Sequence, residues 1–141
     1  MTTFLRSVRT RIAAVSFGFE TRLEFNLGET KVDTMEKVIE AIDKIKYMGG
    51  ATGPKLAFRM VRNEVEPLAR VDSHQVMMFI TDGISNIDGP SQKEATYLRE
   101  RGKFEIYAIG KMEHLLRPYL YSVVGTKHPL CGQPRLSGFE K

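Results

Sequence analysis

The stretch that decides the fold is Val76-Met-Met-Phe-Ile80, an uninterrupted apolar run that ends in Thr81-Asp82-Gly83. A short apolar run bounded by turn residues is typical of a strand that is covered on both faces, as in a parallel sheet. Asp82 follows this strand directly. Because ligands of open α/β sheets bind at the carboxyl ends of the strands, Asp82 is the first candidate functional residue.

Two further strands are expected upstream of this run. Ile12 to Phe17 is a nearly continuous apolar run, which predicts a second buried strand of the parallel type. Arg22 to Leu27 alternates between apolar and polar residues, which predicts a strand with one face in water. We expect this strand to pair back on the first as a hairpin edge.

Helical spacing of apolar residues predicts two helices between these strands and Val76. The first has Asp33 and Glu36 as candidate caps and runs up to Gly49-Gly50. The second begins at Pro54, because proline suits the first helical position. The expected buried positions are Val32, Met35, Val38, Ile39, Ile42 and Ile45 in the first helix, and Leu56, Ala57, Met60, Val61 and Val65 in the second.

After Asp82, Ser91 and Glu94 have the spacing of a capping box, which predicts a helix that stops at Gly102. Phe104 to Ile109 is the next expected strand. A last helix is expected over 115–123, with Pro118 either kinking it or marking its beginning. The alternation of strands and helices predicts an α/β fold, a Rossmann-like three-layer α/β/α sandwich with a mostly parallel sheet and one antiparallel edge strand.

Composition restricts the class of protein. The 141 residues are 42% hydrophobic, which suits one domain with a real core. The net charge of +4 comes from mixed basic and acidic residues, and no aromatic residues interleave with the basic clusters, so we expect no nucleic acid partner. No apolar run approaches the roughly 20 residues of a membrane span, and the start has no signal peptide pattern. Cys131 is the only cysteine, so an internal disulfide is excluded.

Several catalytic motifs do not fit. Gly49 to Lys55 resembles a phosphate-binding loop, but Pro54 separates the glycine from the lysine and a helix precedes it. Gly83 to Ile87 lacks the final glycine of a nucleophile elbow. Oxygen ligands do not alternate from Asp82 as in a calcium loop, and the three histidines lack zinc spacing. We therefore expect no serine hydrolase chemistry and no zinc site.

Thr52 and Asp82 remain as a pair of hard oxygen ligands. Thr52 precedes a helix and Asp82 follows a strand, so both can reach the same sheet edge. A hydroxyl and a carboxylate suit Mg²⁺, which keeps several waters and accepts an incoming carboxylate. The alternative interpretation is that Thr52 or Gly53 only caps the helix and Asp82 only holds a turn.

Five ordered blocks now resemble a von Willebrand factor type A domain. They are Arg11-Ile-Ala-Ala-Val-Ser-Phe-Gly, Leu23-Glu-Phe-Asn-Leu, Gly49-Gly-Ala-Thr52, Phe79-Ile-Thr-Asp82-Gly-Ile-Ser-Asn, and Glu105-Ile-Tyr-Ala-Ile-Gly. The resemblance runs over residues 4–124, and we interpret 125–141 as a tail or linker. It implies a metal-ion-dependent adhesion site, in which Thr52 matches the threonine ligand and Asp82 the second aspartate. It also implies an extracellular binding module that contacts an acidic residue of a protein partner.

The family also implies a central strand ending in Asp-x-Ser-x-Ser, and this sequence contains no such motif. That strand would lie between Ile12–Phe17 and Val76–Ile80, and three of the five family ligands would come from its motif. We therefore expect an incomplete metal site and a fragment, an isoform or an incomplete gene model. The sequence leaves two alternatives open, the regulatory part of a complement-type serine protease and a domain that binds without metal.

Overall fold

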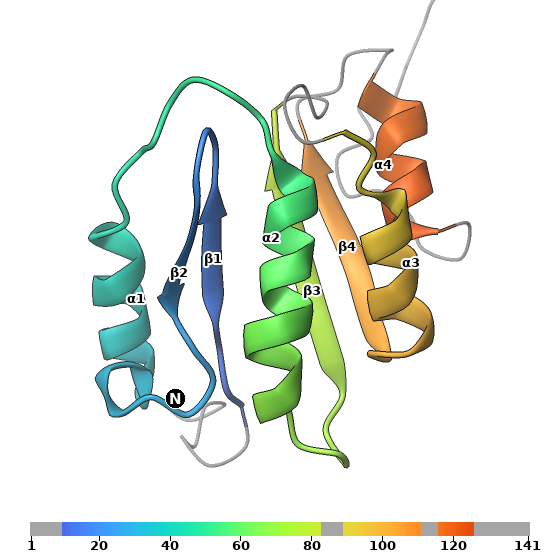
Figure 1. Ribbon diagram of the computed structural model, residues 1–141. Helices are drawn as coiled ribbons and strands as arrows, with labels where there is room; N and C mark the ends of the chain where they lie inside the picture. The colour runs from blue at the N-terminus through green and yellow to red at the C-terminus, as the bar shows by residue number, and fades with distance from the viewer. Residues whose placement is uncertain (1–9, 83–88, 111–115, 126–141) are drawn as a thin grey trace, which may run out of the picture.

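The computed structural model describes residues 10–82, 89–110 and 116–125, and the order of its elements is the one expected (Figure 1). The last expected helix starts within two residues of Pro118, which lies in the first turn, where a missing amide donor is tolerated. The strands are β1 (Ala14–Phe17), β2 (Thr21–Phe25), β3 (Gln75–Thr81) and β4 (Phe104–Gly110). The helices are α1 (Met35–Asp43), α2 (Pro54–Met60), α3 (Gln92–Glu100) and α4 (Leu116–Val124), with short helical turns at Thr30–Val32, Val61–Val65 and Glu66–Leu68.

The strands form two ladders. β1 and β2 pair antiparallel, from Phe17 opposite Thr21 to Ala14 opposite Phe25, as the predicted hairpin edge requires. β3 and β4 pair parallel, from Gln75 opposite Phe104 to Thr81 opposite Gly110. Within the described residues no ladder joins β1 to β3, so a strand position stays open between them, where the family's central strand was expected (Figure 1).

Three phenylalanines bridge this open position. The rings of Phe17 on β1 and Phe79 on β3 stack with centroids 5.6 Å apart and planes at 20°. Phe58 of α2 lies against the same Phe79 ring at 5.1 Å. Neighbouring strands in a sheet are about 4.8 Å apart and joined by backbone hydrogen bonds, whereas here side chains alone make the connection.

The main core lies between the β3–β4 ladder and the helices α2, α3 and α4. Figure 1 shows α2 and α3 in front of the strands. The buried members of this core are Phe58, Phe79, Ala95, Leu98, Phe104, Ile106, Ala108, Tyr119, Leu120, Val123 and Val124. The sheet and its covering helices give the expected α/β class. None of the helices in the described ranges is long and apolar enough to cross a membrane.

The opposite face of β3 corrects one expectation. The apolar run of β3 was predicted to be buried on both faces, but its alternate residues Val76, Met78 and Ile80 are exposed. On the neighbouring strand the Tyr107 hydroxyl donates to Glu105 at 2.5 Å, and this bond, with burial, raises the pKa of Tyr107. β1 is likewise only half-buried. Neither run is therefore buried on both faces in the described part of the chain.

Helix α1 differs from its prediction in its cap, its end and its buried face. It was expected to run up to Gly49-Gly50 and ends at Asp43. The Thr34 hydroxyl accepts from the Lys37 backbone amide at the start, whereas the expected cap Asp33 pairs with the Lys37 ammonium at 2.7 Å. Ile39 and Ile42 were expected in the core and are about half exposed. Only Val38 of this helix is buried, in a small second cluster with Phe25 and Val32.

Helix α2 begins at Pro54 as predicted, but its buried face is rotated. Leu56 was expected inside and is exposed, while Phe58, absent from the predicted stripe, is buried against Phe79. The helix then widens into a π turn over Val61–Val65 and ends near Pro67. Proline removes an amide donor and clashes with the preceding turn, which accounts for the ending.

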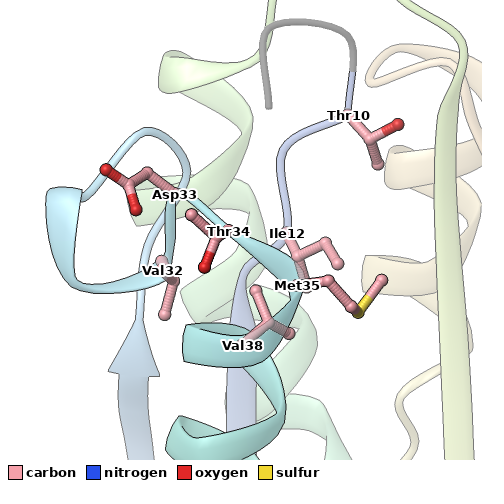
Figure 2. A pocket seen from close by; sticks show the side chains of 7 residues that line it. All are labelled: Thr10, Ile12, Val32, Asp33, Thr34, Met35 and Val38. Carbon is pink, nitrogen blue, oxygen red and sulfur yellow. The ribbon is translucent and has the colours of Figure 1, made fainter. Parts of the chain in front are cut away.

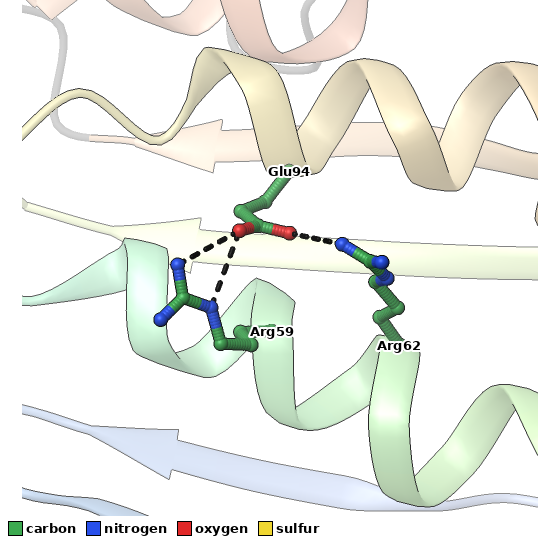
Figure 3. Close-up of polar contacts among 3 residues, drawn as sticks. All are labelled: Arg59, Arg62 and Glu94. Atoms are coloured by element: carbon green, nitrogen blue, oxygen red, sulfur yellow. Dashed lines mark hydrogen bonds and ion pairs between the residues drawn. The ribbon is translucent and has the colours of Figure 1, made fainter.

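The predicted capping box at α3 is wrong in its bonds, although Ser91 does precede the helix. Ser91 is fully buried, and its hydroxyl is 2.7 Å from the Tyr119 hydroxyl, so it ties α3 to α4. Glu94 instead faces α2, where Arg59 donates to one carboxylate oxygen at 3.0 Å and Arg62 to the other at 3.3 Å (Figure 3). These charges hold α2 and α3 side by side.

Replacing Phe79 by leucine should destabilise the fold by about 1–3 kcal/mol, because two aromatic contacts worth about 0.5–1.5 kcal/mol each are lost. Met78→Leu is the matched control, since Met78 is 61% exposed and Phe79 only 4%. Urea unfolding of both variants measures the difference. Equal losses in the two variants would show that the Phe79 contacts do not stabilise the fold.

Glu94→Gln should lower the free energy of unfolding by about 1 kcal/mol, since it removes the carboxylate shared by Arg59 and Arg62. The loss should shrink at high salt, because both arginines are partly exposed and screened. Glu100→Gln at the exposed end of the same helix is the control, with an expected change within about 0.5 kcal/mol. A loss that does not respond to salt would contradict the electrostatic explanation.

Candidate functional site

Asp82 lies at the carboxyl end of β3, as the sequence predicted. The strand ends at Thr81, whose side chain is buried, and the next residue turns out into solvent. Asp82 is exposed, so its carboxylate is accessible from outside the sheet. This is the edge where an open α/β sheet binds its ligands.

Thr52 lies in the segment between α1 and α2, which runs over the tip of the β1–β2 hairpin (Figure 1). The contact is close, because a Cβ on Gly18 would be 3.1 Å from the carbonyl oxygen of Gly49 and 3.6 Å from that of Ala51. Any larger residue at position 18 would push this segment away. Thr52 follows directly, half-buried, and Gly53 and Pro54 are buried behind it at the start of α2.

The fold therefore brings Thr52 and Asp82 to the same edge, on either side of the open strand position. Thr52 is held beside the end of β1, and Asp82 stands at the end of β3. A hydroxyl and an exposed carboxylate are the hard oxygen donors that Mg²⁺ takes, but they are two of about six ligands. Across the described ranges no group of three or more His, Cys, Asp or Glu side chains could hold a metal ion. The two residues fit part of such a site.

The surroundings of Thr52 are basic. Residues 44–55 contain three lysines and no acidic residue. Lys44 is paired with Glu40 at 2.6 Å, whereas Lys46 and Lys55 have no ion pair within the part of the chain that the structure describes. The Thr52 side of this edge thus carries two lysines without an ion pair among the described residues, and their positive charge attracts anionic groups.

A small hollow lies away from this edge, at the start of α1 and before β1 (Figure 2). It is lined by Thr10, Ile12, Val32, Asp33, Thr34, Met35 and Val38. Its volume of about 20 Å³ suits one water molecule, far below the hundreds of cubic ångströms of a small-molecule site. This hollow is therefore too small to hold a small-molecule ligand.

Sequence reasoning did not single out two exposed aromatic residues at this edge. Phe19 at the tip of the hairpin is 74% exposed, and Tyr47 in the segment before Thr52 is 94% exposed. The sequence did contain a signal for their exposure. Phe19 directly follows Gly18 and Tyr47 lies two residues before Gly49, and both glycines mark turns.

Comparison with known proteins identifies the same fold. The family model of the von Willebrand factor type A domain matches residues 2–131. Human cochlin is 34% identical over 91 residues, which are 62% of this chain and 16% of cochlin. Mouse von Willebrand factor A domain-containing protein 2 is 33% identical over 102 residues, which are 72% of this chain and 12% of that protein. The chain thus spans a small part of its relatives.

A solved structure agrees with this match. Proximal thread matrix protein 1 from the mussel byssus, with a zinc-occupied metal-ion-dependent adhesion site, superposes with a TM-score of 0.69 and 28% identity. The likeness covers 81% of this chain and 28% of the mussel chain. The chain belongs to the von Willebrand factor type A domain family.

Proposed function

We propose that this chain is a protein-binding adhesion module that receives an acidic residue of its partner at the carboxyl edge of the sheet. Thr52 and Asp82 would hold Mg²⁺ there as part of a metal-ion-dependent adhesion site. We further propose that the module acts outside the cell, without catalysis of its own. Its folding unit would be residues 4–124, with 125–141 as a tail or linker.

The observation that carries this proposal is the common position of Thr52 and Asp82. Two residues 30 positions apart in sequence flank one open strand position, at the edge where α/β sheets bind ligands. The mussel relative, with zinc at its adhesion site, supports the same use of this edge. The basic surroundings of Thr52 add attraction for an acidic partner.

Each residue has a distinct task in this proposal. The Asp82 carboxylate supplies the negative charge that attracts the cation, and its exposure leaves it accessible. The Thr52 hydroxyl adds a neutral oxygen, so the site keeps net positive charge. When bound, Mg²⁺ offers a coordination position to the carboxylate of the partner. The backbone contact between Gly18 and Gly49 keeps the Thr52 segment in place.

Millimolar Mg²⁺ should raise the melting temperature of the chain, because a ligand that binds only the folded state stabilises it, by about 2.7 kcal/mol at 100 times its Kd. Asp82→Asn should abolish the shift, since it removes the only charged ligand of the pair. Asp72→Asn, at another exposed aspartate, should retain it. Differential scanning calorimetry measures all three proteins.

The same titration separates this proposal from metal-independent binding. Equal Mg²⁺ shifts in the Asp82→Asn and Asp72→Asn variants would mean that the cation acts elsewhere. No shift in the unaltered chain would support a module that binds without metal, in which Asp82 only shapes its turn.

A further inference from the structure

Phe19 and Tyr47 are two exposed aromatic residues that belong to neither core of the described chain. Their rings are 74% and 94% exposed, and neither belongs to either core cluster. Single exposed apolar residues are ordinary on protein surfaces. These two differ because they come from separate segments that meet at one point.

That point is Gly49. Gly18, the neighbour of Phe19, packs against the Gly49 carbonyl with a hypothetical Cβ only 3.1 Å away. On the other side, the Tyr47 ring lies 3.6 Å from the position a Gly49 Cβ would take. Gly49 has a φ of 63°, a conformation that favours glycine. The segments that carry the two aromatic residues therefore meet at Gly49, in the same stretch of chain as Thr52.

The charges near the aromatic pair indicate what it binds. Lys46 precedes Tyr47 and is exposed, and Lys55 lies three residues after Thr52. Neither lysine has an ion pair among the described residues, and positions 44–55 contain no acidic side chain. At the hairpin tip, the Glu20 carboxylate is already neutralised by Arg22 at 2.9 Å. The surface therefore combines apolar rings with free positive charge.

We propose that Phe19 and Tyr47 are the anchor residues of a surface that binds an acidic peptide segment with apolar side chains beside its carboxylate. Aromatic residues dominate the binding energy of protein interfaces, because they bury a large rigid area. The apolar side chains of the partner would pack on the two rings, while Lys46 attracts its carboxylate. This inference rests on the proposed function only in taking the carboxyl edge as the side that the partner approaches.

The test uses two-dimensional NMR titration of the full chain with the capped peptide Gly-Leu-Glu-Leu-Gly, since NMR detects weak binding. We expect shifts of the amide signals of Phe19 and Tyr47. Phe19→Ser and Tyr47→Ser should each weaken the affinity about tenfold. Val71→Ser is the matched control, because Val71 is 98% exposed and lies in the turn before β3, so its loss should leave the affinity unchanged.

Two altered peptides define the partner chemistry. Replacing both leucines by serine should weaken binding as much as removing a ring, and replacing glutamate by glutamine should weaken it several-fold. Equal affinity for all three peptides would overturn the proposal, as would a failure of the first peptide to shift the Phe19 and Tyr47 signals. Unchanged affinity in both ring variants would overturn it as well.

Repeating the peptide titration once with Mg²⁺ and once with EDTA separates this inference from the proposed function. If peptide binding requires the two rings but not Mg²⁺, the proposed aromatic surface is supported and the proposed metal-assisted contact is rejected. If peptide binding requires Mg²⁺ but neither ring, the proposed aromatic surface is rejected and the proposed metal-assisted contact is supported.

Discussion

The contact of Phe79 with Phe17 and Phe58 is the interaction on which the arrangement of the described chain depends. Two ladders that share no backbone hydrogen bond in the described residues are connected there, and helix α2 lies over the junction. Backbone pairing would fix the register of neighbouring strands, whereas a ring stack fixes only proximity. In the described residues β1 and β3 are therefore positioned by side-chain packing, to which the three rings and the hydrogen bond from the Asn26 amide to the Glu64 carbonyl oxygen contribute.

Much of the fold could be predicted from sequence periodicity, and the errors in burial arise because periodicity does not record tertiary contacts. The run at Val76 to Ile80 was correctly assigned to a strand, but Val76, Met78 and Ile80 are exposed because no described element covers their face. The spacing of apolar residues indicates which side chains of an element can be buried, but not which other element covers them. Ile39 and Ile42 were misplaced for the same reason. Phe58 was missed because the buried face of α2 is set by Phe79, a contact 21 residues away.

The capping box failed for a different reason. Ser91 and Glu94 have the right spacing, but each finds a stronger partner on another helix, Ser91 at Tyr119 and Glu94 at two arginines of the α2 region. A local hydrogen bond competes with tertiary ones, and a charge shared by two guanidinium groups outweighs a single amide.

The candidate site was predictable only in part. The pair of Thr52 and Asp82 came from the family pattern, while Phe19 and Tyr47 required the three-dimensional fold.

The residues that stabilise the fold differ from those of the proposed binding surface. The buried phenylalanines hold the ladders together, and their loss changes the free energy of unfolding. Phe19, Tyr47, Lys46 and Asp82 are exposed and belong to neither core cluster, so they can change with little effect on folding. Asp82 is placed by the end of β3, whereas Phe19, Tyr47 and Lys46 lie near Gly18 and Gly49, where a Cβ at position 18 would be 3.1 Å from the Gly49 carbonyl oxygen. A binding surface built in this way can alter its specificity residue by residue while the glycine contact keeps it in place.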